Sequence, residues 1–327
     1  MQCGKLWPTG EVWAMPDVST AVHSGPAAQN RGKTPAAAAP SSALPVALLV
    51  VIGLLLWYAG AIWLNAPGAI ERVLQPAKGD AWGVQDLLGA TWSMQRPVLP
   101  APHQVGIDFV SSITDWPVDS PRNLLRHVWV TGQTTVLGFA MGLVLGLVLA
   151  ILMVHSRTLD RALLPWVVAS QTLPVLALAP IVLIILGSIG LSGLLPKAVI
   201  AMYLCFFPVA IALVQGLRSP QRIESELLHT YAASRWQTLW MLRLPSALPF
   251  LFPALKVAVA AGLVGAMVAE LPTGAQAGLG SRLLTGSYYG NTVQIWSALL
   301  MASLLGVALT ALVTLVERWV LRNRRKA

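Results

Sequence analysis

Six apolar segments divide this chain, and each is long enough to cross a membrane as a helix. A helix needs about 20 mostly apolar residues to cross a hydrocarbon core of about 30 Å. The six segments are residues 44–64, 128–154, 163–186, 194–214, 250–269 and 293–316. The pattern therefore predicts an all-α integral membrane protein with about six transmembrane helices.

The stretches outside these segments are more polar. Residues 1–43 are rich in Ala, Pro, Ser and Gly and lack apolar periodicity, which predicts a disordered tail. Residues 65–127 form a long connection, within which 105–113 has the pattern of a short interfacial helix. The chain ends in a basic tail, residues 317–327. Residues 128–316 then form the main transmembrane core.

Basic residues in the short connections predict how the helices are oriented. Cytoplasmic loops of membrane proteins carry an excess of Lys and Arg. The two short loops on one side hold only Lys197 and Arg282. The segments on the other side are much richer in basic residues, and they are residues 1–43, 155–161, 216–249 and 317–327. We therefore expect a multi-pass protein with both termini in the cytoplasm and with 65–127 on the extracytoplasmic side.

Composition agrees with a membrane protein and argues against a nucleic-acid-binding protein. Hydrophobic residues make up 56% of the chain and charged residues 11%, whereas a soluble domain carries about 25% charged residues. The net charge of +9 is concentrated at helix ends and in short loops, without a basic stripe interleaved with aromatic residues. The two cysteines, Cys3 and Cys205, have no partner at the spacing of a disulfide framework or a zinc site.

The connection 216–249 carries the most informative pattern in the chain. Ser219-Pro220 predicts the start of a short helix, because a capping hydroxyl is followed by proline at the first helical position. Apolar residues then recur on one face of that helix, and they are Ile223, Leu227, Leu228 and Tyr231. An apolar stripe outside the membrane needs either a protein partner or the bilayer surface to cover it.

A second short helix is predicted directly after the first. Ser234, with Gln237 three residues later, has the pattern of a capping box, and Pro245 is expected to end the helix. We therefore expect two short helices that meet at an angle on the cytoplasmic side and expose apolar side chains.

The same residues resemble the EAA loop of ATP-binding-cassette (ABC) importer permeases, which are binding-protein-dependent transport proteins. That pattern is Glu-Ala-Ala, three residues, Gly, nine residues and Ile-x-Leu-Pro. Glu226, Leu244 and Pro245 match it, while Leu242 replaces the isoleucine. Both alanines and the glycine are replaced, by Leu227, Leu228 and Ala232 respectively.

Further segments extend the resemblance from about residue 99 to the end of the chain. Ser234 and Arg235 lie in an Ala-Ser-Arg-Trp-Gln run typical of the branch that moves sulfonates, taurine and nitrate. Leu99-Pro100-Ala101-Pro102 is similar to the family's Leu-Pro-Ser-Pro segment. Ala269-Glu270 followed by Gly278-Leu279-Gly280 is similar to the segment after the family's fifth span.

The resemblance implies a fold, partners and a location. It implies the type I importer permease fold in a bacterial inner membrane, with a second permease copy in a homodimer. It also implies a separate ATPase subunit, which carries the ATP and Mg, and an extracytoplasmic solute-binding protein. The 216–249 connection, called here the coupling loop, would dock on the ATPase. The implied solute is a small anion such as a sulfonate, taurine or nitrate, or a small heterocycle.

Motifs for chemistry within this chain are missing from the sequence. A phosphate-cradling loop reads G-x-x-x-x-G-K-[ST], and Gly32-Lys33-Thr34 supplies only its end because position 27 is Ala27. We find no paired carboxylates within the spans, no metal-binding histidine pair and no nucleophile elbow. We therefore expect no catalytic residue, metal site or cofactor in this chain, and no enzymatic activity of its own.

Polar residues within the spans are candidates for the solute pathway, because they are costly in lipid unless they face a cavity or a partner. Gln171 and Thr172 precede Pro174 in the third segment, and hydrogen bonding between helices is the alternative role for them. Pro174 and Pro180 are expected to kink this segment, and the third and fourth segments could instead form a helical hairpin that does not fully cross. Glu270, at a predicted outer end, is either an outer gate or binding-protein contact or simply an interfacial carboxylate. Gly138, Gly142 and Gly146 lie on one helix face, which favours close helix packing over a glycine-lined path.

Three other functions compete with the importer interpretation. An ion-coupled secondary transporter or channel would need an ionisable pair at membrane depth, and the predicted spans lack Asp and Glu before Glu270. A membrane-embedded enzyme would need Asp, His or Cys clustered at one membrane face. A scaffold without transport activity would rest its amphipathic loop on lipid.

Overall fold

The computed structural model describes residues 43–79, 81–272 and 277–324. The chain divides into two units, Met1–Val51 and Ile52–Ala327. Of the first unit only residues 43–51 are described, and they begin helix α1 (Ala43–Ala69). The rest of the predicted tail 1–43, including Gly32-Lys33-Thr34, lies outside the described residues. Throughout the described ranges the regular elements are helices.

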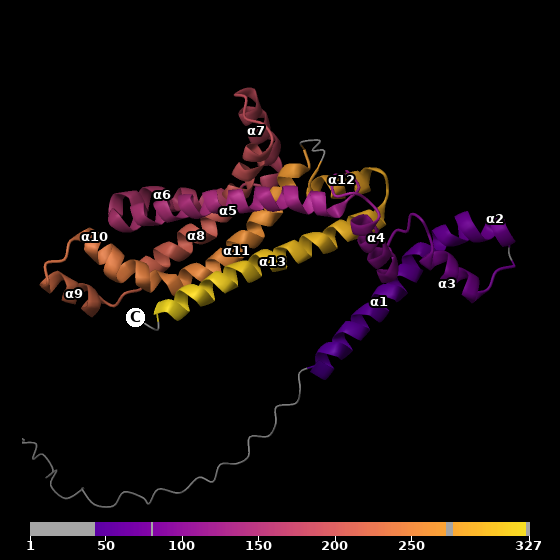
Figure 1. Cartoon of the computed structure of the whole chain (residues 1–327), viewed down its shortest axis with the longest axis horizontal. Coiled ribbons are helices and arrows are strands. Elements are labelled where there is room, and N and C mark those ends of the chain that lie inside the picture. The colour runs from indigo at the N-terminus through magenta and orange to yellow at the C-terminus, as the bar shows by residue number, and fades with distance from the viewer. Residues whose placement is uncertain (1–42, 80, 273–276, 325–327) are drawn as a thin grey trace, which may run out of the picture. The chain divides into compact units, whose positions relative to one another are not determined.

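Five helices are long and apolar enough to cross a membrane, and they match five of the six predicted segments. The candidate spans are Leu44–Ala77, Leu124–His155, Leu194–Leu217, Arg235–Glu270 and Thr292–Arg322. In the second unit, α5 (Leu124–His155), α8 (Leu194–Leu217), α11 (Leu244–Glu270) and α13 (Thr292–Arg324) lie lengthwise beside one another (Figure 1).

The third predicted segment, residues 163–186, is broken at the proline where a kink was expected. The segment consists of α6 (Arg157–Ala169), a 3-10 turn η2 (Ser170–Thr172) and α7 (Val175–Ser188), with a bend of 105° between the two parts. Pro174 explains the break, because proline disfavours helical backbone at the residue before it. Leu173 accordingly has an extended ψ of 126°. In Figure 1, α7 projects away from the long helices.

The three-glycine face of α5 packs directly against α8. A Cβ added at Gly142 would lie 2.4 Å from the Cβ of Cys205, and one at Gly138 would lie 2.4 Å from the Cβ of Ala201. A Cβ added at Gly146 would lie 2.8 Å from Cγ1 of Val209. These positions must be glycine for the two helices to approach so closely, which confirms the prediction of close packing.

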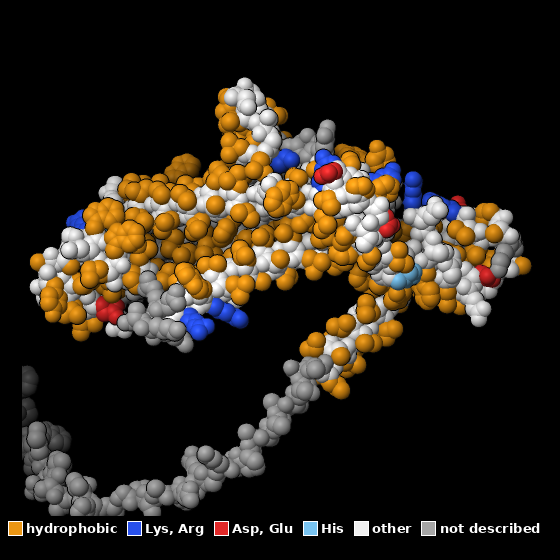
Figure 2. Space-filling model, viewed as in Figure 1, with side chains coloured by type: hydrophobic (Ala, Val, Ile, Leu, Met, Phe, Trp, Pro, Cys, Tyr) orange, Lys and Arg blue, Asp and Glu red, His pale blue; other side chains and the backbone are white. Residues whose placement is uncertain are grey.

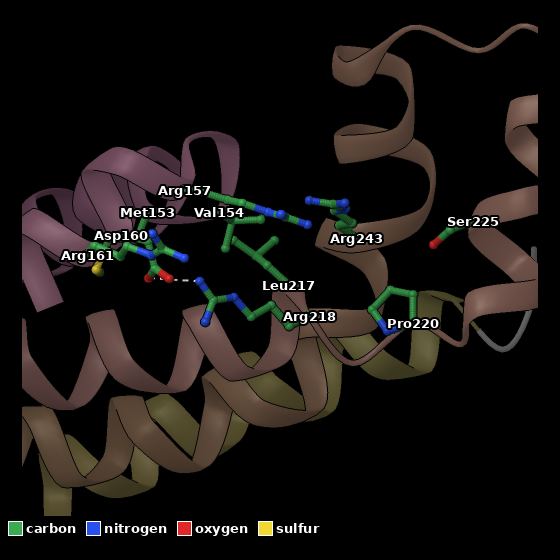
Figure 3. A pocket seen from close by; sticks show the side chains of 10 residues that line it. All are labelled: Met153, Val154, Arg157, Asp160, Arg161, Leu217, Arg218, Pro220, Ser225 and Arg243. Atoms are coloured by element: carbon green, nitrogen blue, oxygen red, sulfur yellow. Dashed lines mark ion pairs between the residues drawn. The ribbon is translucent and has the colours of Figure 1, made fainter.

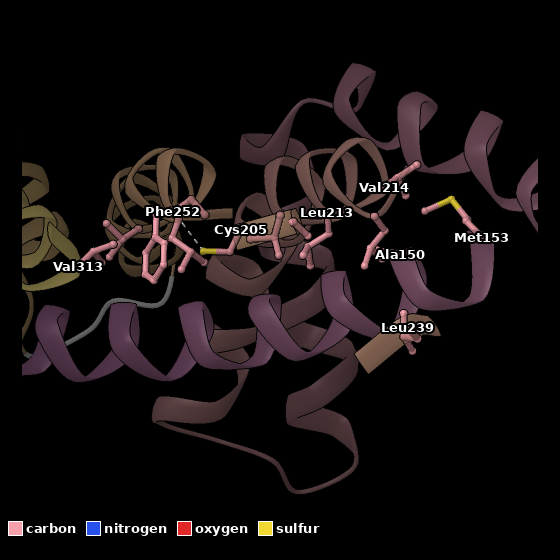
Figure 4. Close-up of a cluster of buried hydrophobic side chains, with 14 residues drawn as sticks. Ala150, Met153, Cys205, Leu213, Val214, Leu239, Phe252 and Val313 are labelled. Atoms are coloured by element: carbon pink, nitrogen blue, oxygen red, sulfur yellow. Dashed lines mark hydrogen bonds between the residues drawn. The ribbon is translucent and has the colours of Figure 1, made fainter. Parts of the chain in front are cut away.

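A hydrophobic core at the coupling-loop end joins α5, α8 and α11. Ala150 and Met153 from α5 and Leu213 from α8 are buried there (Figure 4). Cys205 donates a hydrogen bond from its Sγ to the Ala258 carbonyl oxygen at 3.1 Å, so this thiol holds α8 against α11. Leu239, from the coupling loop, is fully buried in the same core.

The connection predicted at 65–127 contains more helix than expected. The first span was predicted to end at 64, but α1 continues through a π-helical turn η1 (Ile70–Leu74) into α2 (Gln75–Lys78). Two further helices follow, α3 (Val84–Trp92) and α4 (Pro102–Thr114). The second of these confirms the short helix predicted at 105–113.

Asn65 fixes the segment that leads into α4. Its Oδ1 accepts hydrogen bonds from the backbone N–H groups of Val98 (2.7 Å) and Leu99 (3.2 Å), and its Nδ2 donates to the Leu99 carbonyl at 2.8 Å. Trp57 Nε1 donates to the Pro100 carbonyl at 3.0 Å. The Leu-Pro-Ala-Pro segment is therefore held against the side of α1.

The remaining helices are α9 (Arg222–Thr230), α10 (Arg235–Thr238), a π-helical turn η3 (Leu239–Arg243) and α12 (Leu279–Tyr288). The last helix, α13, extends to Arg324. The basic segment predicted as a tail at 317–327 is therefore mostly its final turns, and residues 325–327 lie outside the described residues.

Candidate coupling loop and solute pathway

The first helix of the coupling loop, α9, begins at Arg222 rather than at the predicted Ser219-Pro220. Ser219 is not free to cap it, because its hydroxyl donates a hydrogen bond to the Gly216 carbonyl at 2.8 Å, at the end of α8. Gln221 is the N-cap residue instead, and its backbone N–H donates to Glu224 Oε2 at 3.0 Å. Glu224 also lies in the first turn of α9, where its negative charge interacts favourably with the helix dipole.

The bend between the two short helices is set at Ala232. This residue has φ of 53°, and it is the only described non-glycine residue with positive φ. The backbone N–H groups of Ala232 and Ala233 donate to the carbonyls of His229 (3.0 Å) and Leu228 (3.1 Å), which satisfies carbonyls at the end of α9. Left-handed backbone favours glycine, and Ala232 stands at the position where the EAA pattern has glycine.

The second helix begins as predicted but does not end as predicted. Ser234 Oγ accepts from the Gln237 N–H at 3.3 Å, and Gln237 Oε1 accepts from the Ser234 N–H at 2.7 Å, which confirms the capping box. Pro245 does not end the helix: α10, η3 and α11 run on as one span from Arg235 to Glu270. Pro245 falls in the first turn of α11, directly after the π-helical turn, where its missing N–H is tolerated.

The coupling loop exposes a band of large apolar side chains. Tyr231 is 78% exposed and Trp240 is 67% exposed. The band as a whole comprises Ile223, Leu227, Tyr231, Trp236, Trp240 and Met241. Figure 2 shows hydrophobic side chains gathered at the end of the bundle where α9 and α10 lie. Exposed apolar patches of this kind occur where a protein contacts a partner or a membrane.

Of the other predicted residues of the loop, some are exposed beside this band and others pack toward the core. Glu226 is exposed and pairs with Arg222 on the same helix at 2.9 Å. Leu244 packs against the hydrophobic core, and Leu228 is half-buried. Arg235 is exposed at the start of α10.

Gln171 and Thr172 lie at the bend between α6 and α7, and both are exposed. Thr172 Oγ1 donates to the Ala169 carbonyl at 2.7 Å, while the Gln171 amide has no hydrogen-bond partner among the described residues. Tyr203 on α8 donates its hydroxyl to the Ser170 carbonyl, so the bend is attached to α8. The predicted interhelical hydrogen bonds of Gln171 and Thr172 themselves do not form within this part of the chain.

The side chain of Glu270 is fully buried. Its carboxylate oxygens accept from Thr131 Oγ1 at 2.8 and 3.0 Å, and Oε2 accepts from the Gly280 N–H at 2.7 Å. Thr131 Oγ1 in turn accepts from the Leu279 N–H at 2.8 Å. Glu270 therefore joins the end of α11 to α5 and to the start of α12.

An apolar hollow of about 760 Å³ lies beside the first half of α5. Its walls come from α5, from Leu194 at the start of α8 and from Leu305 on α13. Trp129 and Gln133 supply its aromatic surface and its amide, and no charged side chain lines it. Sequence analysis did not find this hollow, since only the packing of three separate helices creates it.

An ion pair joins two of the long helices, contrary to the prediction that the spans hold no ionisable pair. Lys256 on α11 lies 2.6 Å from Glu317 on α13, and both side chains are half-buried. The prediction missed the pair because Glu317 was assigned to the tail, whereas α13 continues past it. In the described part of the chain, no group of three or more His, Cys, Asp or Glu side chains is arranged to hold a metal ion.

Comparison with known proteins decides the family. Residues 142–326 match the binding-protein-dependent transport system inner membrane component family. This chain belongs to that family. The matched region contains the coupling loop, the bent α6–α7 pair and the long helices α8, α11 and α13, so the predicted resemblance to ABC importer permeases and their all-α fold is confirmed.

Individual permeases are similar along most of their length. The formylaminopyrimidine transport permease protein ThiX of Halalkalibacterium halodurans is 33% identical over 237 residues, which are 71% of this permease and 88% of the relative. The riboflavin transport system permease protein RibX of Chloroflexus aurantiacus is 33% identical over 225 residues, 69% and 80% of the two chains. The taurine transport system permease protein TauC of Escherichia coli is 27% identical over 236 residues, 70% and 83%.

Proposed function

We propose that this permease forms the solute pathway of an ATP-driven importer and is moved by a separate ATPase that binds the coupling loop. One observation carries the proposal. The exposed apolar band of the coupling loop is continuous, through η3 and without a hinge at Pro245, with the span that ends at Glu270. A force applied to α10 would therefore be transmitted along a single helix through the membrane.

Each part of the coupling loop has a role in this proposal. Leu227 and Trp236 would enter a groove of the ATPase, since large apolar side chains dominate such interfaces. Glu226 and Arg222 would lie at the rim of the contact, where charges set orientation. ATP and Mg would be held by the partner, and an extracytoplasmic binding protein would deliver the solute at the opposite end of the spans.

A second copy of the permease would complete the pathway. Helix α7 exposes large apolar side chains after the bend, including Leu176, Ile184 and Ile185. Beside them, Gln171 and Thr172 are exposed at the bend itself. Polar groups at membrane depth need a partner or a water-filled path, and a homodimer that faces the two bends toward each other supplies both.

A small heterocycle is the solute that we favour over a small anion. The hollow beside α5 offers an aromatic ring and an amide, Trp129 and Gln133, and lacks a cationic side chain. Such a lining suits a flat, weakly charged ring, which stacks on aromatic groups and hydrogen-bonds to amides. The two relatives at 33% identity are named for formylaminopyrimidine and riboflavin, whereas the sulfonate and taurine permeases are 25% and 27% identical.

The docking role of the coupling loop is tested by reversing one charge on it. Glu226→Arg is expected to reduce co-purification of the ATPase and uptake, with normal membrane insertion. Glu71→Arg is the matched control, because Glu71 is also an exposed helical carboxylate but is far from the coupling loop in the sequence. The proposed role of this position is wrong if the Glu226 variant still binds the ATPase and transports at the level of the control.

The solute is tested separately on the binding protein that we expect to be encoded beside this permease. We expect heterocycles such as formylaminopyrimidine to raise its thermal unfolding midpoint, and taurine and alkyl sulfonates to leave it unchanged. The reverse pattern would leave the importer function intact and reject the proposed solute class.

A further inference from the structure

A cavity of about 480 Å³ with a strongly basic lining lies between α6, the end of α8 and the coupling loop (Figure 3). Four arginines line it: Arg157 and Arg161 from α6, Arg218 at the end of α8 and Arg243 at the end of η3. Asp160 is the one carboxylate in the lining, and it pairs with Arg218 at 2.8 Å. The remaining three arginines have no ion-pair partner among the described residues.

A second hollow of about 540 Å³ continues the first along the inner side of the coupling loop. The two share Arg157 and Arg243 in their walls, and the second adds His155, His229 and Arg235. No carboxylate lines the second hollow. Both ring nitrogens of His155 are buried without a hydrogen-bond partner, and buried polar atoms of this kind call for a ligand or water.

The nearby carboxylates of the coupling loop are engaged elsewhere. Glu226 pairs with Arg222 on α9, and Glu224 accepts the hydrogen bond from the Gln221 backbone. The excess of positive charge in the two hollows is therefore not balanced by the described residues. Arg157, Arg161 and Arg218 are exposed and Arg243 is half-buried, so solvent screens part of the repulsion between these like charges, and a bound anion relieves the rest.

We propose that this basic cavity binds a phosphate-class oxyanion, either the headgroup phosphate of an anionic lipid or free phosphate. Arginine suits phosphate because its planar guanidinium donates two parallel hydrogen bonds to the oxygens. The cavity lies where α5 and α8 end, and the proposed function places these ends at the cytoplasmic face, which is rich in anionic lipid.

A bound oxyanion would connect the coupling loop to the core. Arg157 belongs to α6 and Arg218 caps the end of α8, whereas Ser225 and Arg243 belong to α9 and η3 of the coupling loop. An anion shared between them would hold the loop in the position from which it moves α11. Lipid composition or phosphate would then tune coupling without touching the ATPase-facing band.

The test uses the full chain alone, in nanodiscs, with hydrogen exchange as the readout. In phosphatidylglycerol discs, we expect exchange in residues 153–161 and 218–243 to slow about tenfold relative to phosphatidylcholine discs if the lipid is the source. Adding inorganic phosphate to phosphatidylcholine discs, with chloride at equal ionic strength as the control, gives the same protection if free phosphate is the source. Absence of protection in both arms would overturn the proposal, as would protection that requires the ATPase.

Paired variants separate a built site from general attraction. Arg157→Gln with Arg243→Gln is expected to weaken the effective ligand about tenfold or more, since two charge-assisted contacts are lost. Arg222→Gln with Arg322→Gln removes the same charge at exposed positions outside the cavity and is expected to change binding less than twofold. If the two double variants lose the same amount of binding, the proposal is overturned. If the cavity variant does not fold, the nanodisc comparisons with the unmutated chain decide the question. Binding here does not depend on transport, so its failure is distinguishable from failure of the importer function.

Discussion

The bend of the coupling loop depends on the backbone of one residue. Ala232 adopts a left-handed conformation that costs an L-residue about 1–2 kcal/mol, and in that conformation the N–H groups of Ala232 and Ala233 satisfy two carbonyls at the end of α9. The position is occupied by glycine in the EAA pattern for this physical reason. The permease therefore carries strain at the point where its two short helices meet.

Ala232→Gly is expected to relieve that strain. The gain is about 0.5–1 kcal/mol, because part of the relief is lost to the greater entropy of glycine in the unfolded chain. Ala233→Gly is the matched control, since Ala233 does not have positive φ, and it is expected to cost about 0.4–1 kcal/mol. Thermal unfolding midpoints and hydrogen exchange across α9 and α10 measure both, and a destabilised Ala232 variant would refute strain at this position.

Gly142 tests the close contact of α5 and α8. Gly142→Ala places a Cβ 2.4 Å from that of Cys205, and overpacking of this kind costs about 1–3 kcal/mol. Gly106→Ala is the control, because Gly106 lies within α4 with nothing within 4 Å of the added atom, and it is expected to stabilise by about 0.5–1 kcal/mol. The packing account is wrong if the two variants have the same unfolding midpoint.

Among the elements, those defined by local sequence were predictable and those defined by distant contacts were not. The long apolar helices and the Ser234 capping box follow from periodicity and spacing along the chain. The π-helical turn that carries the span past Pro245 has no such pattern. The burial of Glu270 depends on Thr131, which is 139 residues away in the sequence. The break at Pro174 follows from the proline itself, whereas its angle of 105° has no signal in the sequence.

Glu270→Gln is expected to loosen the connection between α11 and α12. A glutamine amide nitrogen placed opposite the Gly280 N–H would set two donors against each other, which costs about 1–3 kcal/mol in a buried site. We expect faster hydrogen exchange in residues 277–288 and a lower unfolding midpoint. Glu71→Gln, at an exposed helical carboxylate, is expected to leave both unchanged, and equal behaviour of the two variants would contradict the structural role of Glu270.

At the scale of the whole molecule, the arrangement links an external binding face to the membrane span. The apolar band of the coupling loop is exposed, whereas Leu239 of the same loop is buried in the hydrophobic core. The segment from α10 through α11 forms one span. Family membership supports an ATPase as the external motor, but the Lys256–Glu317 pair is the kind of group that an ion-coupled transporter uses. ATP-driven transport and ion-coupled transport make opposite predictions for a variant of this pair.

Glu317→Gln distinguishes between them. If the pair only joins α11 to α13, uptake by the complex is expected to stay within about twofold of wild type, with a modest loss of stability because the ion pair is partly exposed. If the pair couples transport to protons, the variant loses uptake driven by a pH gradient. Uptake into proteoliposomes, with ATP or with a pH gradient, measures the difference.

The orientation of the spans is tested by labelling. Ser225→Cys and Ser287→Cys, each in a Cys3→Ser background, place thiols at opposite ends of the spans, and Cys205 stays buried. In intact cells, we expect an impermeant maleimide to label position 287 and not position 225. Labelling of position 225 from outside would place the coupling loop on the wrong side for an ATPase.

The most direct test of the central claim is transport by the purified permease, reconstituted with and without its ATPase and binding protein. Proteoliposomes that contain all three are expected to accumulate solute only when ATP is supplied on the coupling-loop side. The permease alone is expected to move none. Solute movement at the same rate without a nucleotide-hydrolysing partner would contradict the claim that the coupling loop is driven by an external motor.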